Sequence, residues 1–177
     1  MLRGEKVKLR AVEREDLKTL YQLEQDLDLV LMADGNWQPI PLATMEKGFD
    51  KDVENEDRSW FIIEADGKVI GSVGLHHRDR RLHMSAFGIA IYDREYLGKG
   101  YGRDAIATLF KWAFDIQNYR RIWLETWSTN ERAIRCYQSL GFVEEGRLRQ
   151  HGYYDGKYFD VVLMGLMRSE WEARRNR

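Results

Sequence analysis

The feature that most constrains the fold is a run of three glycines at alternate positions within Leu97–Arg103. A strand-like apolar run precedes it at 86–91, and apolar residues at helical spacing follow it over 104–114. Glycine lets the backbone approach a ligand closely, and the first N–H groups of a helix face anions. A strand, a glycine turn and a helix in this order therefore predict a phosphate site, although a glycine-assisted helix entry explains so short a motif equally well.

Two other phosphate-binding loops fit this run poorly. A dinucleotide fingerprint needs Gly-x-Gly-x-x-Gly, and when the pattern starts at Gly98 its sixth position is Arg103. A start at Gly100 ends on Ala105, a weak match that a polar loop separates from the strand. A Walker loop needs Gly-Lys before Ser or Thr, whereas here a glycine follows the lysine.

Composition bounds the class of protein. The 177 residues suit one domain, which we expect to span 1–177, and a net charge of −1 gives no indication of a nucleic-acid partner. The 6 Trp and 9 Tyr are not interleaved with basic residues, so we expect them to pack in the core. The single cysteine, Cys136, excludes an internal disulfide and a multi-cysteine metal site. It lies in a helical pattern and is expected to be a buried thiol rather than a nucleophile, and no metal is expected.

The ends of the sequence carry no targeting signal that we recognise. The first residues are polar, and no apolar run approaches the length of a membrane span. We therefore expect a cytoplasmic protein without a membrane partner. The basic end, Arg174–Arg177, is interpreted as a solvated tail.

Periodicity and turn residues predict a mixed α/β domain. Strands are expected at 6–12, 59–64, 69–75, 86–91, 122–127, 142–148 and 158–166. Helices are expected at 13–24, 42–55, 104–118 and 131–140, with Thr44 as a possible cap of the second. Asp66-Gly67 predicts a hairpin turn, Arg78–Arg81 predicts a polar turn, and the proline-containing segment 33–41 predicts a loop.

A second block decides the interpretation of the glycine run. It is Asn130–Phe142, with the sequence Asn-Glu-Arg-Ala-Ile-Arg-Cys-Tyr-Gln-Ser-Leu-Gly-Phe. Together the two motifs resemble the GNAT acetyltransferase superfamily over nearly the whole chain. The segments 145–149 and 155–160 are most similar to its ribosomal-protein-alanine and diamine acetyltransferase branch. The resemblance implies a central, mostly antiparallel, twisted sheet of about seven strands flanked by about four helices.

The resemblance also implies a co-substrate, acetyl-coenzyme A. Its pyrophosphate would lie on the turn formed by Gly98, Lys99, Gly100, Tyr101, Gly102 and Arg103, with the helix dipole behind it. Its pantetheine arm and acetyl carbonyl would pair with the strand formed by Ile89, Ala90 and Ile91. Leu97 departs from the Gln, Arg or Trp common in relatives, which matters little where backbone amides do the binding.

The same resemblance gives roles to three further residues. Asn130 would cap a helix and contact the co-substrate, and Tyr137 would protonate the departing thiolate. Glu125 is the first candidate for the base that accepts the amine proton. His76 and His77 are weaker candidates; because neighbouring strand residues point to opposite faces, they are poor joint metal ligands. His83 and His151 are interpreted as turn or surface residues.

The acceptor is less constrained than the donor. The resemblance implies a primary amine: a peptide N-terminus, a polyamine, or another small amine such as an amino acid or aminoglycoside. The first two helices, the Trp37 loop and the hairpin around Tyr153 and Tyr154 would frame it. Acidic residues could attract a polyamine, although a solvated helix face is the simpler interpretation of Asp26, Asp28, Asp34, Glu54 and Glu56.

Alternatives from other classes remain at this point. A homodimer is possible because relatives often form one. A coenzyme-A-binding sensor or scaffold without catalysis is the main rival function, and a nucleotide-binding oxidoreductase is a distant third.

Overall fold

The computed structural model describes residues 1–33 and 38–175. Its centre is an eight-stranded sheet in the order β1-β2-β3-β4-β5-β6-β8-β7. The strands are β1 (Leu2–Arg3), β2 (Lys8–Ala11), β3 (Ser59–Ala65), β4 (Lys68–Asp79), β5 (Met84–Ile91), β6 (Arg121–Trp127), β7 (Val143–Tyr154) and β8 (Lys157–Met167). Every neighbouring pair is antiparallel except β5 and β6, which are parallel. The expected mixed α/β, mostly antiparallel architecture is confirmed, with one strand more than the seven predicted.

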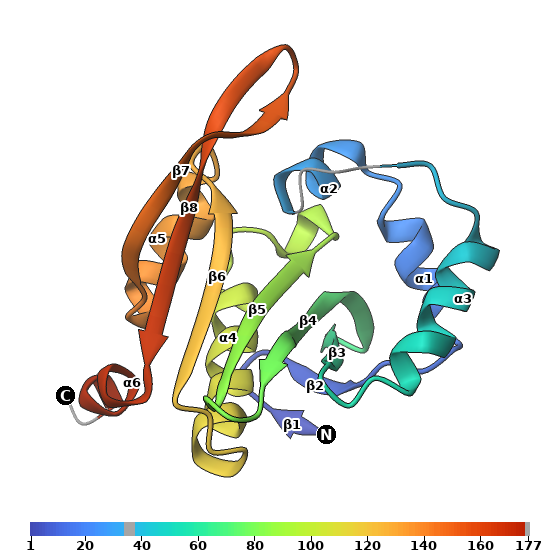
Figure 1. Cartoon of the computed structure of the whole chain (residues 1–177). Coiled ribbons are helices and arrows are strands. Elements are labelled where there is room, and N and C mark those ends of the chain that lie inside the picture. The colour runs from blue at the N-terminus through green and yellow to red at the C-terminus, as the bar shows by residue number, and fades with distance from the viewer. Residues whose placement is uncertain (34–37, 176–177) are drawn as a thin grey trace.

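Helices cover both faces of this sheet (Figure 1). They are α1 (Asp16–Leu23), α2 (Leu27–Ala33), α3 (Leu42–Val53), α4 (Tyr101–Lys111), α5 (Glu131–Leu140) and α6 (Arg168–Arg175), with a 3₁₀ turn η1 (Arg94–Tyr96) and a π-helical segment η2 (Trp112–Ile116). The sequence predicted four of the six α-helices in the described residues. It missed α2 and α6, which are among the shortest at 7 and 8 residues and therefore show little periodicity.

Alternation along β3 explains why both faces are covered. Ile62 points into a cluster with Leu17 and Leu20 of α1, whereas its neighbour Ile63 points into the main core with Phe110 of α4. Both isoleucines are fully buried, so the strand has no solvent-facing side there. A strand buried on both faces places one helical layer on each side of the sheet.

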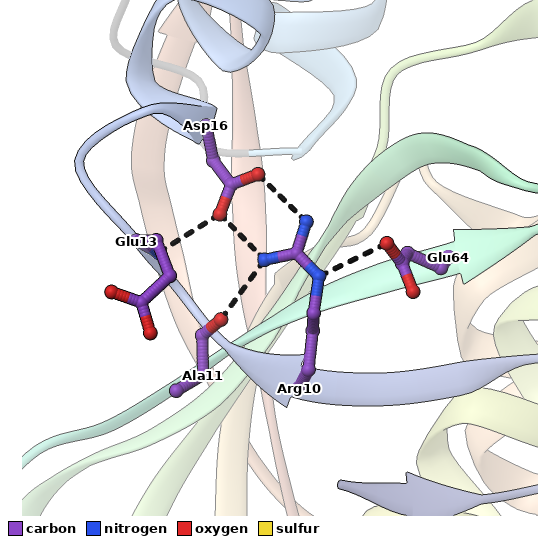
Figure 2. Close-up of polar contacts among 5 residues, drawn as sticks. All are labelled: Arg10, Ala11, Glu13, Asp16 and Glu64. Atoms are coloured by element: carbon purple, nitrogen blue, oxygen red, sulfur yellow. Dashed lines mark hydrogen bonds and ion pairs between the residues drawn. The ribbon is translucent and has the colours of Figure 1, made fainter.

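An ion-pair cluster holds α1 against the sheet. Arg10 on β2 donates to both carboxylate oxygens of Asp16, at 2.6 and 2.7 Å, and to Glu64 on β3 at 3.0 Å. Figure 2 shows the guanidinium between the two acids, with the Glu13 N–H donating to Asp16 as well. Burial alone would raise the pKa of Asp16, but these hydrogen bonds outweigh it and the pKa is lowered.

Positive φ angles mark local turns at three places, and the first is the hairpin turn predicted from Asp66-Gly67. Asp66 and Gly67 have φ of 51° and 76°, as a tight hairpin between β3 and β4 requires. Asp155 and Gly156 adopt the same conformation between β7 and β8. Gly141 ends α5 at φ 103° in the left-handed region.

Several boundary predictions were wrong. Pro41, not Thr44, occupies the cap position of α3, and no side chain caps it. Helix α4 begins at Tyr101, inside the glycine run, rather than at Asp104. Strand β4 continues through Arg78 and Asp79, so the polar turn starts at residue 80. Because strand and helix ends are fixed by pairing partners distant in sequence, they are the least predictable part of an element.

Arg174 and Arg175 lie in α6 rather than in a solvated tail, and the rest of the predicted tail, 176–177, lies outside the described residues. Trp171 of α6 is buried and stacks on Phe114, with ring centroids 5.9 Å apart. Arg174 donates to the carbonyl of Ser139 at 2.6 Å, and Arg175 forms an ion pair with Asp115 at 2.7 Å. The tail interpretation was wrong for Arg174 and Arg175, because the periodicity of so short a helix rests largely on one tryptophan, Trp171.

Candidate active site

The central parallel pair of strands separates along its length, and a cavity fills the gap. The partners of β5 and β6 are Met84 with Arg121, Ser85 with Ile122, and Ala86 with Trp123. In the described chain the pairing goes no further, although both strands continue. A cavity of about 410 Å³ lies beyond this point, lined by residues 87–91 of β5 and by Glu125 and Thr126 of β6. The predicted strand residues Ile89, Ala90 and Ile91 all line it.

The glycine turn closes one end of this cavity. Gly98 and Gly100 have φ of 70° and 89°, a conformation that costs other residues roughly 1 to 2 kcal/mol. Gly100 is the residue immediately before α4, so the unpaired N–H groups of that helix begin at the cavity wall. Gly98, Gly100, Gly102 and Arg103, four of the six residues expected to form the pyrophosphate turn, line the cavity.

Two members of the predicted turn lie outside the lining. The Lys99 carbonyl faces Lys6, which donates to it at 2.9 Å. The Tyr101 ring packs edge-on against Tyr96, with centroids 4.9 Å apart. Tyr96 itself lines the cavity and is a wall residue that the sequence did not reveal.

Helix α5 supplies the opposite wall. The Asn130 side chain accepts a hydrogen bond from the Ala133 N–H at 3.2 Å, which confirms the predicted cap, and it also lines the cavity. Tyr137 is buried two turns further on and meets Phe87 edge-on at 6.1 Å. Burial, with a smaller effect of Cys136, raises the pKa of Tyr137, so its hydroxyl stays protonated well beyond neutral pH.

The cavity is bordered by exposed arginines. Arg103 on α4 and Arg132 and Arg135 on α5 are lining residues, and Glu125 is the single acid among them. Arg135 pairs with Glu131 at 3.0 Å, whereas no ion pair involving Arg103 or Arg132 occurs within residues 1–33 and 38–175. A net charge of −1 therefore conceals a locally basic site. The i, i+3 spacing of Arg132 and Arg135 could have indicated it.

Cys136 also lines this cavity and is half-buried, less enclosed than predicted. Burial raises the pKa of its thiol, although Arg103 and Arg132 act in the opposite direction. A thiol kept protonated is a poor nucleophile.

Glu125 and the histidines differ in their relation to the cavity. Glu125 is exposed and lines it, whereas neither His76 nor His77 does. The register pairs His76 with Ala86, and Ala86 with Trp123 of β6. Glu125 follows Trp123 by two residues, so it lies on the same face of the sheet as His76. The expectation that the two histidines point apart was wrong: a bulge with His77 at φ 51° brings their rings to 5.0 Å. His83 lies in a turn and His151 on the surface, as predicted.

A second hollow of about 390 Å³ adjoins the first and shares Asn130 with it. Its walls come from α2, the loop after β6 and the β7–β8 hairpin, which extends beyond the rest of the sheet in Figure 1. They include three aromatic residues and two acids: Trp127, Tyr154, Phe159, Asp28 and Asp155. Tyr153 packs on Tyr158 instead, and Trp37 and Asp34 lie outside the described residues.

The acids of the N-terminal half are mostly paired. Asp26 and Asp28 both accept from Arg94, at 2.5 and 3.2 Å, and the Arg94 hydrogen bond lowers the pKa of Asp26. Glu56 pairs with Arg80, and Glu54 is exposed.

Residues 1–33 and 38–175 contain no group of three or more His, Cys, Asp or Glu that could hold a metal ion. No helix in that part of the chain is long and apolar enough to span a bilayer.

The sequence profile of the Acetyltransferase (GNAT) domain matches residues 6–143 of this chain. The chain belongs to the GNAT acetyltransferase family. The spermidine N(1)-acetyltransferase of Vibrio cholerae serotype O1 is 30% identical over 170 residues, 94% of this chain and 95% of the relative. YokL, an uncharacterized prophage-derived N-acetyltransferase of Bacillus subtilis, is 25% identical over 169 residues, 96% of this chain and 94% of the relative.

A solved GNAT structure has the same arrangement of elements. It is spermidine N-acetyltransferase from Vibrio cholerae in complex with CoA and spermine, with a TM-score of 0.88 and 27% identity. The match covers 96% of this chain and 99% of that one. The resemblance inferred from the two motifs is confirmed, and the chain is a GNAT N-acetyltransferase.

Proposed function

We propose that this GNAT enzyme transfers the acetyl group of acetyl-coenzyme A to a primary amine of a polyamine, and that residues 1–177 act as one domain. The observation that carries the proposal is the cavity between the separated strands β5 and β6, with a glycine turn at one end and a buried tyrosine in its wall. The relative solved with CoA and spermine supports both substrates. The main core supports a single domain because it includes both Val7 and Trp171.

The glycine turn and the basic border would hold the donor. Backbone N–H groups at the start of α4 suit a pyrophosphate, and Arg103 and Arg132 add positive charge near it. Over Ile89–Ile91, β5 pairs with β4 on one side but has no β6 partner on the other, and this free edge offers backbone groups to the amides of the pantetheine arm. This arrangement would align the thioester carbonyl for attack.

Transfer then needs two proton movements. The neutral amine attacks the thioester carbon, a C–N bond forms, and the C–S bond breaks as the tetrahedral intermediate collapses. The amine proton passes to Glu125, directly or through water, and Tyr137 donates its proton to the departing sulfur. Burial raises the pKa of Tyr137 and would raise that of a thiol beside it too, so the higher phenol pKa does not by itself oppose proton donation to the sulfur.

The second hollow would take the acceptor. Trp127, Tyr154 and Phe159 present aromatic rings, which attract ammonium groups, and Asp28 and Asp155 add carboxylates at its border. Asn130 lies in both hollows, so an amine bound there can reach the thioester. Lys157 also lines the hollow and Asp28 is shared with Arg94, so the preference for a long cation with a free primary amine rests on the three rings and on Asp155.

An acetylation assay over an amine panel tests the proposal. Spermidine and spermine should release thiol from acetyl-coenzyme A and gain one acetyl group by mass spectrometry. An N-terminal alanine peptide and free amino acids should react at least tenfold more slowly than the polyamines. A factor of about ten or more is what a substrate loses when a few polar contacts with the enzyme are missing. Faster acetylation of the peptide would reassign the acceptor, and coenzyme binding without any transfer would exclude catalysis.

A further inference from the structure

One lysine far from the glycine run in sequence holds that run from outside the cavity. Lys6 donates from Nζ to the Lys99 carbonyl at 2.9 Å, and its ammonium lies 5.4 Å from the centre of the Tyr101 ring. The same Nζ is 3.7 Å from the position that a Cβ on Gly100 would occupy. The ammonium is therefore seated on the outer side of the turn.

The backbone around Lys6 is itself fixed to α4. The Asp104 carboxylate, in the first turn of the helix, accepts from the N–H groups of Glu5, Lys6 and Val7 at 3.1, 2.7 and 3.0 Å. A Cβ on Gly4 would collide with this carboxylate, so the segment approaches as closely as glycine permits. Lys6 thus reaches the turn from a rigid base rather than from a loose end.

The peptide plane between Lys99 and Gly100 connects this contact to the cavity. In a trans peptide the carbonyl and the N–H point in opposite directions, and no peptide in the described chain is cis. With the carbonyl held outward by Lys6, the Gly100 N–H is turned toward the cavity that Gly100 lines. A cation on the carbonyl also polarises the peptide and strengthens that N–H as a donor.

We propose that Lys6 is a positioning residue for the diphosphate of coenzyme A, acting through the Lys99–Gly100 peptide without touching the ligand. The proposal rests on the coenzyme site of the proposed function. It assigns part of the affinity for the donor to a residue outside the cavity lining. Lys6 should therefore affect thioesters that carry a diphosphate and leave others unaffected.

The test compares Lys6→Met, Lys6→Arg and wild type with two donors: acetyl-coenzyme A and S-acetyl-pantetheine, which lacks the diphosphate. Lys6→Met should raise KM for acetyl-coenzyme A about tenfold, the effect of one charge-assisted hydrogen bond, with kcat within about twofold. Its kinetics with S-acetyl-pantetheine should match wild type, and Lys6→Arg should recover most of the loss. Lys8→Met, an exposed lysine on β2 without such a contact, is the control.

Calorimetric titration of coenzyme A into the same variants separates this proposal from the proposed function. If wild type binds coenzyme A but acetylates nothing, the proposed function fails, and weaker binding by Lys6→Met still supports the role of Lys6. Wild-type affinity in Lys6→Met would overturn that role. An equal loss with both donors would also overturn it, because it would reflect a general disturbance of the fold.

Discussion

At the residue scale, two of the ionisable side chains that line the cavity lie in contrasting surroundings. Tyr137 is buried against Phe87 and Phe142, whereas Glu125 is an exposed residue of the cavity lining. Burial keeps the Tyr137 phenol protonated, whereas Glu125 is open to solvent and to an incoming amine. The buried Tyr137 therefore suits the role of the acid that protonates sulfur, and the exposed Glu125 suits the role of the base that accepts the amine proton.

Replacing Tyr137 with Phe removes only the hydroxyl, so the ring packing with Phe87 should survive. We expect kcat to fall roughly 100-fold or more, the usual contribution of a general acid, with little change in KM for acetyl-coenzyme A. Thiol release at saturating amine measures it. A variant as fast as wild type would mean that another group, or water, protonates the sulfur.

The pH profile of wild type should also reflect the raised pKa of Tyr137. A raised pKa keeps the acid form present to higher pH, so the rate should not decline through tyrosine ionisation below about pH 10. Initial rates from pH 6 to 10 at saturating amine would reveal it. A descending limb near pH 8 that disappears in Tyr137→Phe would contradict this expectation.

Glu125→Gln tests the base. Its rate should fall roughly tenfold or more at pH 7 and approach wild type near pH 10, where free amines lose their proton to water. A defect of the same size at every pH would instead point to a role in binding. Rates at several pH values with one polyamine decide between the two.

At the element scale, α5 carries Asn130 and Tyr137 between two defined ends. Asn130 caps its start, and Gly141 ends it at φ 103°. A Cβ on Gly141 would lie 2.7 Å from Cδ of Arg174, whose guanidinium is tied to the Ser139 carbonyl. The end of α5 is therefore packed against α6 as well as turned by glycine.

Gly141→Ala should destabilise the protein by about 2 kcal/mol or more, because backbone strain and the collision with Arg174 act together. Gly156→Ala is the matched control, since φ is 73° there and no atom lies within 4 Å of the added Cβ. It should cost only about 1 kcal/mol, from strain alone. Urea unfolding of both variants measures the difference, and equal losses would mean that the Arg174 contact adds nothing.

At the scale of the whole molecule, the sheet is covered by helices on both faces and opens where β5 and β6 part. The N-terminal helical layer is fixed to the sheet through the Arg10, Asp16 and Glu64 cluster of Figure 2. That layer contributes Leu29 and Asp28 to the two hollows, so its attachment affects the site.

Asp16→Asn should lower the free energy of unfolding by roughly 1 to 3 kcal/mol at pH 7, because Arg10 loses a partly buried partner. The lowered pKa of Asp16 stabilises the fold fully above its unfolded value near 3.9, and this is lost as pH falls through the folded value. The gap between variant and wild type should therefore narrow below about pH 4.

Asp50→Asn provides the control, since the Arg14–Asp50 pair is more than half exposed and should contribute less than about 1 kcal/mol. Denaturant unfolding at pH 7 and pH 3 compares the variants. A gap for Asp16→Asn that is as large at pH 3 as at pH 7 would mean that shape rather than charge matters at this position.

The sequence by itself determined three segments: strand β5, the glycine turn after it, and helix α5 with its two ends. It could do so because glycine conformation, helix capping and hairpin turns depend on neighbouring residues. Gly98, Gly100, Asn130 and Gly141 could be interpreted without the fold for that reason. The tertiary structure decided what depends on packing between distant segments: the separation of β5 from β6, the border of Arg103 and Arg132, the attachment of α6, and the contact of Lys6 with the Lys99 carbonyl. These arise from chain segments tens of residues apart, and no local pattern encodes which of them will meet.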